Sequence, residues 1–147
     1  MRTTSILGIA IVFLLAPPTT AVATTMEQAT TEQARSSLKN YGFVRCLDAA
    51  YRDSQPLDDD LAAAGAAYHY MGSGAHFIQQ DEEILDVTHD PYQSTAEFIA
   101  RVYPTTHAQT QSQERKNPMI ACLSIYNSIE YDDFIRRQDA YIINVEN

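Results

Sequence analysis

Apolar side chains recur at helical spacing along most of this chain, in segments that proline, glycine or polar residues separate. The first segment runs from Thr31 to Tyr51 and contains no proline. Thr30 and Gln33 have the spacing of a capping box, which predicts that a helix begins there. The apolar face of this helix comprises Leu38, Tyr41, Val44 and Tyr51, widened by Phe43, Cys46, Leu47 and Ala50.

A second helix is predicted after Ser54, which stands where an N-cap residue is expected, shortly before Pro56. We expect it to end at the run Gly72-Ser73-Gly74, because glycine commonly follows the last turn of a helix. One apolar stripe follows its length: Leu57, Leu61, Ala64, Tyr68 and Met71.

The segment Ala75–Thr88 contains an acidic run and no convincing strand pattern. We interpret the run as the solvated face of a helix, because it lacks the glycine and the ligand spacing of a calcium-binding loop. Its carboxylates are Asp81, Glu82, Glu83 and Asp86.

Three further helices are predicted in the C-terminal part of the chain. Ser94 or Thr95 is the expected cap of the first, and Asn117-Pro118 opens the second. Asn127-Ser128 resembles a turn before the third. The apolar run Tyr141–Val145 could be a strand, but we expect it to complete the last helix.

A polar stretch, Thr105–Lys116, separates two of these helices and contains no apolar residue larger than Ala108. A connection of this length is unusual in a compact domain and is typically functional or disordered. We predict that it carries a binding surface, with a disordered linker as the alternative and the acidic run as a second candidate surface. The polar side chains of the stretch that suit binding are His107, Gln109, Gln111, Gln113 and Glu114.

The N-terminus has the features of a cleaved secretory signal peptide. Arg2 precedes the apolar run Ile6–Ala16, which is shorter than the roughly 20 residues that a membrane-spanning helix needs. Pro17-Pro18 follows, and Ala21-Val22-Ala23 offers small residues for cleavage. The sequence therefore predicts a signal peptide at residues 1–23 and a single periplasmic domain at residues 24–147, with no membrane anchor.

Cys46 and Cys122 are the two cysteines of the chain. In an exported protein two cysteines most often pair, although two free buried thiols are the alternative. No C-x-x-C motif supports a redox-active pair or a zinc site. The expected fold is all-α, a compact bundle of about five to six helices with one intramolecular disulfide.

The net charge of −9 argues against nucleic acid and anionic membrane surfaces as partners. It favours a basic partner, or it only keeps the protein soluble. The histidines form no H-E-x-x-H motif, and oxidised cysteines leave no thiolate nucleophile. Asp48 or Asp53 could pair with a distant glutamate as in a glycosidase, but nothing specific supports this. We therefore expect a binding protein without catalysis, metal or cofactor.

The segment Met119–Ile135 is similar to the signature Cys-Ile/Leu-x-x-Tyr-x-Ser-x-x-Leu of immunity proteins that neutralise type VI secretion amidase effectors. It most resembles the fourth family of those proteins, with Tyr131 where the family usually has leucine. Asn40–Leu47 resembles the family's first helix, which also carries a cysteine, and Leu61–Tyr70 resembles its second.

The resemblance implies an all-helical, periplasmic homodimer. It also implies that the protein binds a papain-like amidase, which cuts peptidoglycan stem peptides with a Cys–His pair, and that a protruding loop occludes the amidase groove. Two other hypotheses stay open: a secreted cell-wall glycan hydrolase that uses a carboxylate pair, and a helical carrier of a small apolar ligand.

Overall fold

The structure, a computed structural model, describes residues 20–52, 55–110 and 115–143, of which 20–29 and 55–56 are described by their backbone only. The described chain is mostly helical with one small two-stranded sheet, so the prediction of a helical bundle is confirmed. In chain order the elements are α1 (Thr20–Ala50), α2 (Gln55–Tyr68), β1 (Gln79–Gln80), β2 (Val87–His89), α3 (Pro91–Val102), η1 (Tyr103–Thr105), α4 (Pro118–Tyr126), α5 (Ile129–Arg136) and η2 (Asp139–Tyr141).

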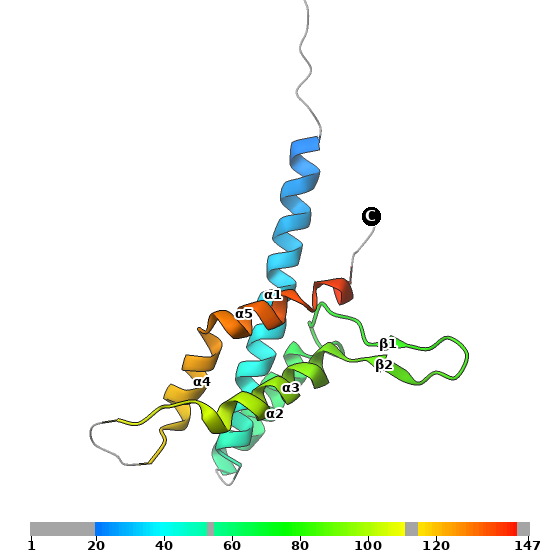
Figure 1. Cartoon of the computed structure of the whole chain (residues 1–147). Coiled ribbons are helices and arrows are strands. Elements are labelled where there is room, and N and C mark those ends of the chain that lie inside the picture. The colour runs from blue at the N-terminus through cyan, green and yellow to red at the C-terminus, as the bar shows by residue number, and fades with distance from the viewer. Residues whose placement is uncertain (1–19, 53–54, 111–114, 144–147) are drawn as a thin grey trace, which may run out of the picture.

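Helix α1 is the central element, and each of α2, α3, α4 and α5 packs against it (Figure 1). The aromatic centre of the core comes from α3 and α5, where the ring of Phe98 stacks on Tyr131 at 5.3 Å and on Phe134 at 4.6 Å. The aliphatic part of the core comes from every helix and includes Leu38, Val44, Leu47, Leu61, Ile99, Ile125 and Ile135.

The close packing of α5 on α1 depends on a glycine. A Cβ atom at Gly42 would lie 1.9 Å from the hydroxyl of Tyr131 and 2.7 Å from Cγ2 of Thr95. The missing side chain lets the buried Tyr131 reach over α1, where its hydroxyl donates to the carbonyl oxygen of Lys39 at 3.2 Å. Gly42 is therefore the contact point of three helices.

The predicted disulfide is confirmed. Cys46 of α1 is bonded to Cys122 of α4, with 5.7 Å between the Cα atoms and a sequence separation of 76. Both cysteines are buried, so the bond ties α4 to the central helix inside the core.

Two predicted helix starts are confirmed by their capping side chains. Asn117 accepts a hydrogen bond from the backbone N–H of Ile120 at 3.1 Å, and Ser128 accepts one from Tyr131 at 3.1 Å. The predicted cap of α3 at Ser94 or Thr95 is wrong, because α3 begins at Pro91 and Asp90 caps it.

Three predicted boundaries are also wrong. Thr30 lies inside α1 and does not begin a helix. Helix α2 ends at Tyr68, so Met71 is exposed in the following turn. The C-terminal run does not complete the last helix: α5 ends at Arg136, and Ile142 instead forms an antiparallel bridge with His76.

No helix in the described ranges is long and apolar enough to span a membrane. Residues 1–19 of the predicted signal peptide lie outside the described residues, so the signal peptide stays a prediction. The predicted cap Ser54 lies outside them as well.

Candidate functional site

The segment Ala75–Thr88 forms a β-hairpin rather than a helix, which corrects the interpretation of its acidic run. Strands β1 and β2 pair antiparallel, with Gln79 opposite His89 and Gln80 opposite Val87. Figure 1 shows this hairpin extending away from the helices. Asp81, Glu82, Glu83 and Asp86 therefore lie at the tip of a projecting hairpin.

The tip is held by hydrogen bonds of its own residues. The Asp81 N–H donates to the Asp86 carbonyl at 2.8 Å, and the Leu85 N–H donates to the Asp81 carbonyl at 3.0 Å. The Asp81 carboxylate accepts from the backbone N–H groups of Glu83 and Ile84 at 2.9 and 3.1 Å. These two hydrogen bonds stabilise the charged form and lower the pKa of Asp81. The tip is therefore a defined turn, with one carboxylate used to shape it.

Apolar side chains are exposed beside these carboxylates. Ile84 is 67% exposed and Leu85 is 69% exposed, and Val87 on β2 is also exposed. An apolar cluster that faces solvent on a projecting element is typical of a surface that a partner covers.

Leu85 also has an unusual backbone conformation. Its φ of 58° places it in the left-handed region, and no other non-glycine residue in the described ranges has a positive φ. This conformation costs a leucine about 1 kcal/mol, whereas asparagine and glycine adopt it more readily. Leu85 therefore combines a strained backbone with an exposed apolar side chain. Backbone strain of this kind is concentrated at functional sites.

The base of the hairpin is fixed to the C-terminal segment. Phe77 donates its N–H to the Tyr141 carbonyl at 2.8 Å, and the two rings meet edge to face. His89 stacks on Tyr141 at 3.9 Å and its Nε2 lies 2.9 Å from Oε1 of the buried Gln138. A fixed base and a hydrogen-bonded turn leave the tip little entropy to lose on binding.

The described ends of the other candidate surface, residues 105–110 and 115–116, lie on the opposite side of the molecule from the hairpin (Figure 1). These ends are attached to the fold: Ala108 is buried, and the Lys116 ammonium donates to the carbonyls of Tyr103 and Pro104 at 2.6 and 2.9 Å. His107 and Gln109 are exposed. Gln111, Gln113 and Glu114 lie outside the described residues. The structure thus separates the two candidate surfaces.

The four histidines do not come together as a site. His69 packs against the ring of Tyr92, His89 stacks on Tyr141, and His107 is exposed on the loop. No group of three or more metal-ligating side chains is found in the part of the chain that the structure describes. Asp48, a member of the suggested carboxylate pair, is ion-paired with Arg45 at 3.1 Å.

His76 is the most unusual of the four, because it is fully buried and neither ring nitrogen has a hydrogen-bond partner among the described residues. Burial lowers its pKa to about 4, although the carboxylate of Asp139 opposes the shift. Its backbone is held by Tyr92, whose hydroxyl donates to the His76 carbonyl at 3.0 Å. The side chain is therefore a neutral core group at pH 7.

Sequence reasoning identified the carboxylates of the hairpin tip but missed the apolar residues Ile84 and Leu85 as site residues. The available signal was an adjacent apolar pair inside an acidic run, which a solvated helix face would not contain.

Comparison with known proteins adds no support to the resemblance to amidase immunity proteins. No family model matches the chain, and no curated protein or solved structure gave a significant match.

Proposed function

We propose that this chain is a periplasmic immunity protein that binds a peptidoglycan-cleaving type VI secretion amidase and inhibits it by occluding its Cys–His groove. The proposal combines the resemblance of Met119–Ile135 with one structural observation, the projecting hairpin whose tip exposes apolar side chains among carboxylates. The protein acts by binding alone, and as a homodimer.

The hairpin tip suits insertion into a groove. It is narrow, because the sheet that carries it has only two strands, β1 and β2. Ile84 and Leu85 supply the apolar area that a buried interface centre needs. Both side chains are largely exposed at the turn, so a partner can cover them.

The charges around the tip indicate which charge the partner's groove should carry. Glu82, Glu83 and Asp86 are exposed beside the apolar pair. A matching groove has an apolar floor and a rim with lysine or arginine side chains, because like charges across an interface cost several kcal/mol. The carboxylates would mainly accelerate association, and the apolar pair would slow dissociation.

The test is co-expression with the protein encoded by the neighbouring open reading frame, followed by co-purification and an assay of peptidoglycan cleavage by that protein. The variant Ile84→Asn/Leu85→Asn removes the apolar pair, and asparagine tolerates the left-handed conformation of Leu85. We expect the affinity to fall about 100-fold or more, because interface energy concentrates in a few central side chains.

The matched control is Ile129→Asn at the start of α5, where the isoleucine is 77% exposed and lies outside the hairpin. It should leave inhibition unchanged. Replacement of residues 106–114 by a short Gly/Ser link tests the other surface. If that variant loses inhibition while the hairpin variant keeps it, the hairpin is not the inhibitory element.

A further inference from the structure

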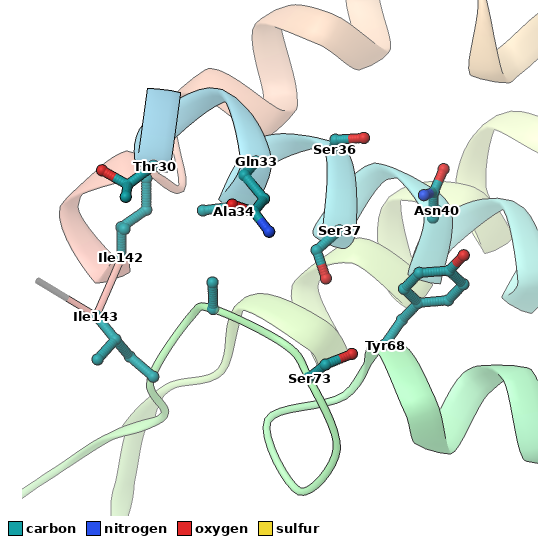
Figure 2. Close-up of a pocket in the computed structure, with 11 residues that line it drawn as sticks. Thr30, Gln33, Ala34, Ser36, Ser37, Asn40, Tyr68, Ser73, Ile142 and Ile143 are labelled. Carbon is teal, nitrogen blue, oxygen red and sulfur yellow. The ribbon is translucent and has the colours of Figure 1, made fainter. Parts of the chain in front are cut away.

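A groove of about 500 Å³ lies beside the middle of α1, between Thr30 and Asn40, away from the hairpin tip. Its lining comes from three separate parts of the chain: α1, the stretch from Tyr68 to Ala75, and the C-terminal Ile142 and Ile143. Figure 2 shows Gln33 and Ser37 of α1 facing the turn that carries Ser73. Tyr68 lies towards one end of the groove and the two isoleucines towards the other. Its volume falls within the range of small-molecule sites.

Most lining residues have polar uncharged side chains, although the surface that they expose to the groove is more apolar than polar. Seven of the eleven lining residues carry a hydroxyl or an amide, and none carries a charge. The charged residues of this part of α1 are used elsewhere: Arg35 pairs with Glu32 and Asp139, and Lys39 pairs with Asp132. An uncharged groove in a chain with a net charge of −9 favours a neutral ligand over a cation or an anion.

One lining group has an unmet hydrogen bond. The hydroxyl of Ser37 is buried and has no partner among the described residues. A buried hydroxyl without a partner costs about 1–3 kcal/mol, so a ligand that bonds to it recovers part of that cost. The neighbouring lining adds apolar contact, since Ala34, Ala75 and the two isoleucines supply only hydrocarbon.

We propose that this groove binds a neutral oligosaccharide of N-acetylated amino sugars, separately from the partner that the hairpin binds. Sugar hydroxyls match the serine hydroxyls, and an acetamido group matches the Gln33 amide with its methyl on the apolar lining. Tyr68 lines one end of the groove and supplies aromatic contact for a pyranose. A charged sugar is disfavoured, because no lining side chain can pair with it.

The experiment titrates the full mature chain with chitotriose and follows backbone amide shifts by NMR. We expect saturable shifts confined to the groove and a dissociation constant in the millimolar range or below. Ser37→Ala should weaken binding about 2- to 10-fold, the value of one neutral hydrogen bond, without loss of thermal stability. Gln33→Ala should weaken it by a similar factor.

Gln93→Ala is the matched control, because Gln93 is an exposed glutamine on α3 that does not line the groove. It should leave the dissociation constant unchanged. Maltotriose, which has hydroxyls but no acetamido group, should bind at least about 5-fold more weakly. The proposal is overturned if chitotriose causes no saturable shifts, if maltotriose binds equally well, or if Ser37→Ala and Gln93→Ala behave alike.

Discussion

Gly42→Ala should destabilise the protein, although the same change in most helices is stabilising. Alanine gains about 1 kcal/mol over glycine inside a helix. At Gly42 the added Cβ would lie 1.9 Å from the Tyr131 hydroxyl and 2.7 Å from Cγ2 of Thr95, both of which belong to fully buried residues. The packing therefore has to open, or Tyr131 has to give up its bond to Lys39.

The expected destabilisation follows from the cost of overpacking and from the cost of the lost Tyr131 hydrogen bond. Overpacking a core costs about 1–3 kcal/mol, and a buried hydroxyl without a partner costs about 1–3 kcal/mol. If both costs apply, subtracting the gain of about 1 kcal/mol in helix propensity leaves a fall of about 1–5 kcal/mol in the free energy of unfolding. Urea unfolding monitored by far-UV circular dichroism measures this change directly.

Gly65→Ala in α2 is the matched control. There the nearest heavy atom to an added Cβ is Cγ1 of Val44 at 3.8 Å, an ordinary contact. This variant should be more stable than the parent by about 0.5–1 kcal/mol. A Gly42→Ala variant as stable as the parent would contradict the close contact at Gly42, and so would a shift of stability in the same direction by both substitutions.

Three further predictions concern stability. The double variant Cys46→Ala/Cys122→Ala should have a free energy of unfolding in urea that is lower by about 4 kcal/mol, because the disulfide links positions 76 apart in the sequence. A loss below about 1 kcal/mol would contradict the loop-entropy model. Burial lowers the pKa of His76 from its ordinary value of 6.5 to about 4. As the pH falls from 6.5 to 4, the unfolded chain therefore binds a proton at this residue that the folded chain does not bind. The free energy of unfolding should fall by about 3 kcal/mol over this range. Unfolding measured across this range in His76→Phe should lack that component. Asp90→Ala removes the cap of α3 and should cost about 1 kcal/mol, whereas Ser94→Ala should cost less than half of that in the same assay.

Features that depend on neighbouring residues could be predicted from the sequence. The apolar repeat of α1, the helix start at Asn117-Pro118 and the turn at Asn127-Ser128 are local signals, because a helix bonds residues four positions apart. The pairing of Cys46 with Cys122 followed from the predicted compartment and from the lack of any other cysteine.

The hairpin and the groove, in contrast, depend on tertiary contacts. Strands β1 and β2 are too short to show an alternating pattern, and their base is held by the distant residues Tyr141 and Ile142. The groove likewise combines α1 with the C-terminal segment. Contacts between residues so far apart in the chain leave no periodic signal in either segment, because each segment supplies only one side of the contact.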